Sequence, residues 1–94
     1  MAPTLAVVSI PVALLQYTGN ESQLRVDAYT VEEALSILDK RFPGLSAFIV
    51  NESGQLRRYV SIFVNEQDIR SGDGMKTKLK EGDRVSIVPL VAGG

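Results

Sequence analysis

The sequence predicts an α+β fold: a mixed sheet of four to five strands with one main helix packed across it. Two strand segments come first, an amphipathic helix follows, and two more strand segments complete the order. A hairpin, a helix and two further strands pack most simply as one sheet with the helix on one face. The length of 94 residues fits one domain, which we place at residues 1–90, followed by a flexible tail of residues 91–94.

The first half of the predicted sheet is a hairpin. Residues 4–10 are rich in β-branched and aliphatic side chains, which favour a strand that Pro11 bends or ends. Residues 17–20 carry a turn signal, and residues 23–28 then alternate between polar and apolar side chains. The residues of this second strand that we expect to face the core are Leu24, Val26 and Ala28.

A helix is predicted directly after the hairpin. Thr30 and Glu33 form the capping-box pattern that satisfies free N–H groups at a helix start. Pro43-Gly44 ends the helix. The apolar residues that share one helix face are Val31, Ala34, Leu35 and Leu38. We expect one further helical turn to cover a flank of the core with Leu45, Phe48 and Ile49.

The second half contributes two more strands. Residues 58–64 alternate, with Val60, Ile62 and Val64 expected on the core face. Residues 65–68 turn the chain, and a short additional strand fits near residues 68–70. A tight turn precedes the last strand at residues 84–90. We expect Val85 and Ile87 of that strand to face inward, and Ser86, Val88 and Leu90 to face outward.

The composition excludes several classes of function. The chain has no cysteine and no histidine, which removes thiol catalysis, disulfides, and the commonest general base and metal ligand. A formal net charge of −1 argues against binding to nucleic acid or to an anionic membrane. The apolar run before Pro11 has no basic residue ahead of it and is too short to span a membrane. We therefore expect a cytoplasmic protein with no bound metal or cofactor that is not itself an enzyme.

The diglycine at residues 93–94 is the strongest candidate for chemistry. A carboxylate that a separate enzyme activates must thread into that enzyme's active site. Glycine has no side chain to block a narrow channel and adopts any backbone angle. We expect Gly94 to carry the reactive carboxylate, with Gly93 and Ala92 threading the channel. The alternative, a frayed end or a cloning remnant, stays open at this point.

An apolar surface beside the tail is the predicted partner-binding site. Phe63, Val88 and Leu90 point away from the predicted core and lie together if their strands are neighbours. Exposed apolar patches often mark partner surfaces. We expect Arg58, with Arg57 and Arg84, to ring this patch. The alternative is that a loop or the N-terminal segment covers it.

The chain resembles the ThiS/MoaD-type sulfur carriers, which have the ubiquitin-like β-grasp fold. The stretches that carry the resemblance are YVSIFVNEQDIR at 59–70, LKEGDRVSIVP at 79–89 and VAGG at 91–94. Their order and spacing, together with the diglycine, are fairly specific. Within the family the length and the ending are most similar to the CysO-like carriers of cysteine biosynthesis.

The resemblance implies a reaction cycle and a set of partners. An E1-like adenylyltransferase of the MoeB/ThiF type would activate Gly94 with ATP. A sulfurtransferase or a sulfide source would then form the thiocarboxylate. The acceptor would be a PLP-dependent cysteine synthase, with a metalloprotease releasing the carrier, or the large subunit of molybdopterin synthase.

Two alternatives to a free carrier remain. As the small subunit of molybdopterin synthase, the chain would form the same thiocarboxylate but stay bound to its partner. As a ubiquitin-like protein modifier, it would join Gly94 to a lysine of another protein.

Overall fold

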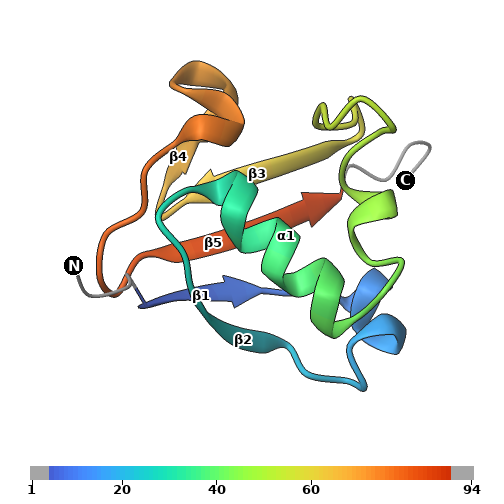
Figure 1. Ribbon diagram of the computed structural model, residues 1–94. Coiled ribbons are helices and arrows are strands. Elements are labelled where there is room, and N and C mark those ends of the chain that lie inside the picture. The colour runs from blue at the N-terminus through green and yellow to red at the C-terminus, as the bar shows by residue number, and fades with distance from the viewer. Residues whose placement is uncertain (1–4, 90–94) are drawn as a thin grey trace.

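The computed structural model describes residues 5–89 and confirms the predicted α+β architecture (Figure 1). The strands are β1 (Leu5–Ser9), β2 (Gln23–Asp27), β3 (Val60–Val64), β4 (Gln67–Asp68) and β5 (Arg84–Pro89). The α-helix is α1 (Val31–Arg41), and the short 3-10 helices are η1 (Val12–Tyr17), η2 (Ser46–Phe48), η3 (Ile69–Ser71) and η4 (Gly74–Lys76).

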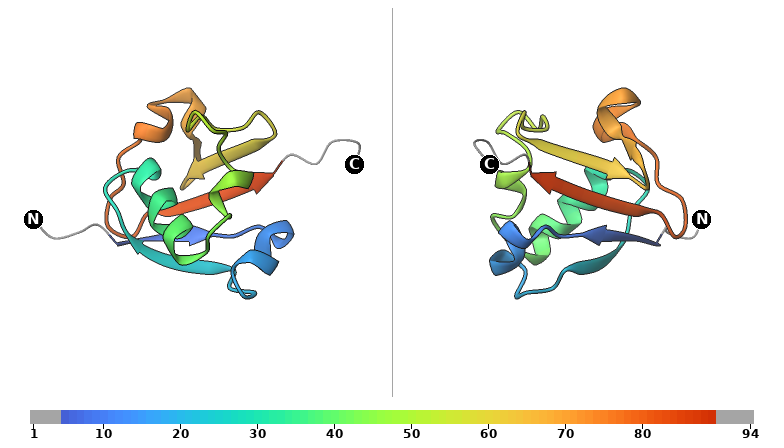
Figure 2. Two further views of the ribbon diagram at one scale, coloured as in Figure 1. Left: turned by 45° about the vertical axis from the view of Figure 1, so that its right-hand side comes forward. Right: turned by 180° about the vertical axis from the view of Figure 1, so that it is seen from behind.

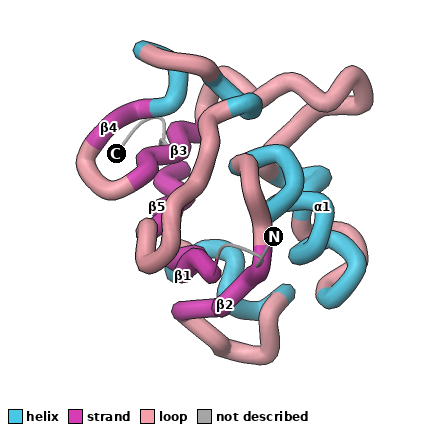
Figure 3. Tube along the Cα trace, turned by 60° about the vertical axis from the view of Figure 1, so that its left-hand side comes forward, coloured by secondary structure: helices cyan, strands magenta, loops and turns pink. Residues whose placement is uncertain are grey.

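The five strands form one mixed sheet in the order β2-β1-β5-β3-β4. The central pair, β1 and β5, is parallel, whereas every other neighbouring pair is antiparallel. Helix α1 lies on one side of the strands, as Figure 3 shows, and the views from front and back agree (Figure 2). The core therefore lies between α1 and the face of the sheet that α1 covers.

The first hairpin forms as predicted, with Leu24, Val26 and Ala28 buried. Ala6 pairs with Val26 and Val8 pairs with Leu24, and all four side chains are buried. The connection after Pro11 was not predicted: it is the 3-10 helix η1, whose Leu14 is buried. Only one of the six side chains of η1 is buried, so the segment lacks the repeated apolar positions by which a helix is predicted from sequence.

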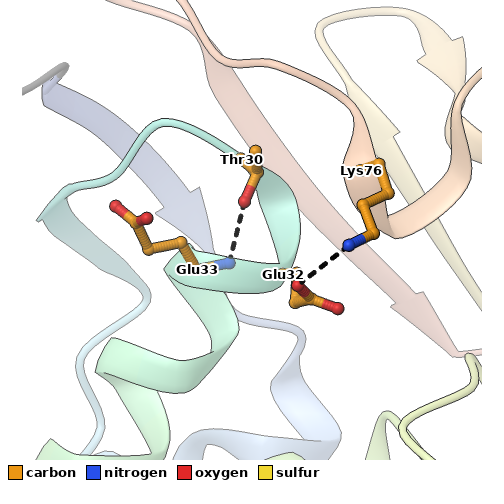
Figure 4. Close-up of polar contacts among 4 residues, drawn as sticks. All are labelled: Thr30, Glu32, Glu33 and Lys76. Atoms are coloured by element: carbon orange, nitrogen blue, oxygen red, sulfur yellow. Dashed lines mark hydrogen bonds and ion pairs between the residues drawn. The ribbon is translucent and has the colours of Figure 1, made fainter.

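Helix α1 begins at the predicted cap. The Glu33 N–H donates to the Thr30 Oγ1 at 3.1 Å, as Figure 4 shows. The Glu33 carboxylate accepts from the N–H of Tyr29 at 3.2 Å, one residue earlier than a standard capping box. The predicted apolar face of α1 is buried in full.

The segment after α1 covers the core with two of the three side chains that were predicted to do so. Leu45 and Ile49 are fully buried, but Phe48 is 41% exposed, so the expectation that it covers the core is wrong. Its ring instead lies against Tyr17 of η1, with the ring centroids 4.6 Å apart. Phe48 lies on the side of the 3-10 helix η2 that faces away from the core. A helix of three residues packs only one of its sides against the core.

The second half of the sheet matches the prediction with small shifts. Val60, Ile62, Val85 and Ile87 are buried as expected, whereas Val64 is only half-buried. The additional strand is present as β4, one residue earlier than predicted, and η3 begins at Ile69. Asn65 makes the turn between β3 and β4 with a positive φ of 58°, a left-handed conformation in which asparagine is enriched.

Candidate functional site

The predicted reactive segment begins where the described structure ends. Gly94, Gly93, Ala92 and Leu90 lie outside the described residues, as does the predicted boundary between domain and tail. What the structure supplies is the element that leads to them, β5, whose last residue is Pro89.

Strand β5 is held on both of its edges. It pairs with β1 from Arg84 to Ser86 and with β3 from Val85 to Pro89. Val85 and Ile87 anchor it to the core at 0% and 4% exposure. The last described residue of β5, Pro89, is therefore held in the sheet by its pairing with Val60 of β3.

Phe63 and Val88 share the sheet face opposite α1. In the antiparallel pairing, Phe63 lies opposite Ser86, and Ser61 lies opposite Val88. Phe63 and Val88 are thus diagonal neighbours, a spacing that long side chains bridge. Val88 is 39% exposed and Phe63 is half-buried. The apolar surface that they form is small, because the serines between them are small and polar.

One of the three arginines predicted to ring the patch lies elsewhere. Arg58 is exposed and lies just before β3, and Arg84 is exposed on β5. The expectation for Arg57 is wrong: its Nε donates to the Ala47 carbonyl at 2.8 Å, which directs the side chain toward η2.

Arg70 takes the position that we expected of Arg57. Its guanidinium donates to the Arg57 carbonyl at 2.6 Å and to the Ser61 Oγ at 3.5 Å. Because Ser61 lies opposite Val88, this places a positive charge beside the apolar face. Sequence reasoning missed Arg70 because only the pairing of β3 with β4 brings it back over β3.

An apolar groove opens where β5 ends, and it was not predicted. Its volume is about 270 Å³. Its walls come from η1, η2, the start of β3 and the end of β5, and include Tyr17, Phe48, Tyr59 and Pro89. Sequence analysis missed the groove because its residues come from four separate segments, which share no local sequence pattern.

Metal sites and membrane-spanning helices are absent from the described residues. Among residues 5–89, no group of three or more acidic, histidine or cysteine side chains is placed to hold a metal ion. Within the same residues, no helix has the length and apolar character needed to cross a membrane.

Comparison with known proteins identifies the family. The model of the ThiS family matches residues 8–94. This chain belongs to the ThiS family. The sulfur carrier protein CysO of Mycobacterium tuberculosis is 37% identical over 89 residues, which cover 93% of this chain and 96% of CysO.

Further relatives in the ThiS family include a solved structure and a protein modifier. CysO in the crystal structure of the Amycolatopsis orientalis BexX/CysO complex superposes with a TM-score of 0.89 at 36% identity, covering 95% of this chain and 99% of that one. Small archaeal modifier protein 3 of Haloferax volcanii is 37% identical over 68 residues, 72% of this chain and 73% of that protein. These relatives confirm the β-grasp fold and the predicted function of a sulfur carrier.

Proposed function

We propose that this ThiS-family protein carries sulfur for cysteine biosynthesis as a thiocarboxylate on Gly94. The observation that carries the proposal is the extent of the family match, which runs from residue 8 through the diglycine to residue 94. The CysO relatives, which match along nearly their whole length, favour the cysteine branch.

The chemistry needs only a carboxylate from this chain. A carboxylate oxygen of Gly94 attacks the α-phosphorus of ATP, and pyrophosphate leaves. Hydrosulfide then attacks the carbonyl carbon of the acyl-adenylate, AMP leaves with the bonding electron pair, and loss of the S–H proton gives the thiocarboxylate. Where a sulfurtransferase persulfide is the nucleophile, the product is an acyl disulfide, which a thiol reduces to the thiocarboxylate. Neither step requires a general base or thiol from the carrier, which agrees with a sequence that has no histidine and no cysteine. The protein thus acts as a co-substrate and not as an enzyme.

The folded part would present the carboxylate at a controlled distance. Residues 90–94 follow directly from β5, and an extended chain spans at most about 3.6 Å per residue, so the carboxylate reaches at most about 18 Å beyond Pro89. Because Pro89 pairs with Val60 of β3, this reach is measured from a residue that belongs to the sheet.

The proposed partners follow from the two steps and from the transfer that comes after. An E1-like enzyme of the MoeB/ThiF type adenylates Gly94, and a sulfurtransferase or sulfide supplies the sulfur. A PLP-dependent cysteine synthase accepts it, and a metalloprotease releases the carrier. The cycle consumes ATP, so we place it in the cytoplasm. No cofactor binds to the carrier itself.

Intact-mass spectrometry tests the proposal directly. The purified protein is incubated with ATP, the host E1-like enzyme and a sulfide source. We expect a mass gain equal to the difference between sulfur and oxygen, and no gain for a variant that lacks Gly94. An unchanged mass with an enzyme that activates another carrier would overturn the thiocarboxylate.

A protein modifier is the second candidate, because small archaeal modifier protein 3 is a relative at 37% identity. A modifier would form isopeptide bonds between Gly94 and lysines. Because Arg84 is the last trypsin site of the chain, tryptic peptides of the host proteome would then carry residues 85–94 as a branch on the modified lysine. A molybdopterin synthase subunit would instead purify with its large subunit at equal stoichiometry. A free carrier predicts neither result.

A further inference from the structure

The apolar groove at the end of β5 concentrates exposed aromatic side chains. Tyr17, Phe48 and Tyr59 are 37%, 41% and 54% exposed, and all three line it. They come from η1, η2 and the residue before β3. Aromatic side chains are enriched in the buried centres of protein interfaces and are costly to leave in water.

The groove lies at the point from which the tail departs. Pro89, which pairs with Val60, forms part of its wall. β5 runs toward the side of the molecule that carries η1 and η2, as the first panel of Figure 2 shows. The groove therefore extends to the last described residue of β5, which directly precedes the tail.

The length of the tail limits how a partner can approach. An enzyme that holds the Gly94 carboxylate must place its active site within about 18 Å of Pro89. A standard interface covers about 800 Å² on each partner, a patch with a radius of about 16 Å. A patch of that size at the start of the tail includes the groove.

The groove is separate from the apolar surface of Phe63 and Val88. Val60 and Ile87 contribute to the groove from the core face of the sheet. Val88 projects from the opposite face, because neighbouring residues of a strand alternate. A partner that covers only the open sheet face would leave the aromatic rings in water.

We propose that the groove lined by Tyr17, Phe48 and Tyr59 receives an apolar side chain of the enzyme that adenylates Gly94. This inference rests on the proposed function. The occupant is leucine, methionine or an aromatic side chain, because the lining supplies no charged group to pair with an ion. The contact acts in binding and positioning, since the groove does not touch the reacting carboxylate.

The test is ATP–pyrophosphate exchange by the host E1-like enzyme, measured against the concentration of the full-length carrier. Ala13→Arg obstructs the groove from an exposed position and removes no packed side chain. Tyr59→Ser removes the most exposed of the three rings. Tyr29→Ser is the matched control, because Tyr29 is 41% exposed and does not line the groove.

We expect Ala13→Arg and Tyr59→Ser each to raise the KM for the carrier at least about fivefold, the effect of losing an interface contact worth about 1 kcal/mol. The kcat stays within about twofold, and Tyr29→Ser behaves as wild type. Thermal unfolding of each variant confirms that the fold is retained. An unchanged KM for Ala13→Arg overturns the inference.

Two further outcomes separate this inference from the proposed function. Exchange by the wild type with no effect of the groove variants overturns the groove alone, whereas no exchange by the wild type overturns both. Sedimentation could show that the wild type is a dimer and that Ala13→Arg makes it a monomer while the KM stays unchanged. That result would assign the groove to a second copy of this chain and would also overturn the inference.

Discussion

The side-chain amide of Asn65 donates to the carboxylate of Asp83 at 3.0 Å, across 18 positions of the sequence. The Asn65 Oδ1 also accepts from the Arg84 N–H at 3.1 Å, and Asp83 accepts from the Lys80 N–H at 2.8 Å. These contacts tie the turn after β3 to the turn before β5. They hold the first residue of β5 beside the turn that follows β3.

Replacing Asn65 separates its backbone role from its side-chain role. Asn65→Ala loses the side-chain hydrogen bonds. Alanine also tolerates the positive φ of 58° less well than asparagine, whose side chain can hydrogen-bond to the local backbone. We expect a loss of about 2 kcal/mol in the free energy of unfolding, measured by urea denaturation. Asn65→Gly keeps the left-handed conformation, so it should cost less than Asn65→Ala. Equal stability of wild type and Asn65→Ala would contradict the account of this turn.

The cap of α1 offers a second test. Thr30→Ala removes the acceptor of the Glu33 N–H, and the expected cost is about 1 kcal/mol of unfolding free energy. The control is Lys76→Ala, which breaks only the 3.9 Å ion pair with Glu32. Both partners of that pair are largely exposed, so its loss should change stability by less than about 0.5 kcal/mol. Equal effects of the two changes would show that the cap is not the stabilising element.

Arg70 should matter through the geometry of its guanidinium. It joins the Arg57 carbonyl to the Ser61 hydroxyl, so Arg70→Lys, with one compact ammonium, cannot keep both contacts. We expect Arg70→Lys and Arg70→Ala to lower the unfolding free energy by about 1 kcal/mol each. Ser61→Ala, which loses only the longer contact, should cost less. A fully stable Arg70→Lys would indicate that charge alone is needed.

The diglycine should matter for activation and not for stability. Gly93→Val adds a branched side chain that would block a narrow channel, and a misplacement of about 1 Å at a reacting group costs about a hundredfold in rate. We expect a loss of that size in pyrophosphate exchange with an unchanged Tm, because the core of the described part of the chain is complete between Ala6 and Ile87. The matched core variant Leu38→Ala should do the reverse, with a loss of about 3 kcal/mol of stability. Rapid exchange by Gly93→Val would rule out the threading role.

The elements that sequence analysis predicted well are those with a strong local pattern. Helix α1 has a cap at Thr30, a periodic apolar face and a stop at Pro43-Gly44. The strands β1, β2, β3 and β5 alternate or are β-branched, and all four formed in place. Helix η1 was missed because a six-residue 3-10 helix with one buried side chain carries almost no periodic signal. Phe48 was misplaced because a single 3-10 turn cannot bury side chains on both of its sides.

The sequence by itself determined the fold class, the family resemblance and the chemistry available to the chain. Local periodicity specifies strands and helices, and the absence of histidine and cysteine limits the protein's own reactivity. Only the tertiary structure decided that Arg70, and not Arg57, lies beside the apolar sheet face. It alone brought Tyr17, Phe48 and Tyr59 together where β5 ends. The physical reason is the same in both cases: these residues are neighbours through strand pairing and packing across long stretches of chain, which leave no mark on local sequence periodicity.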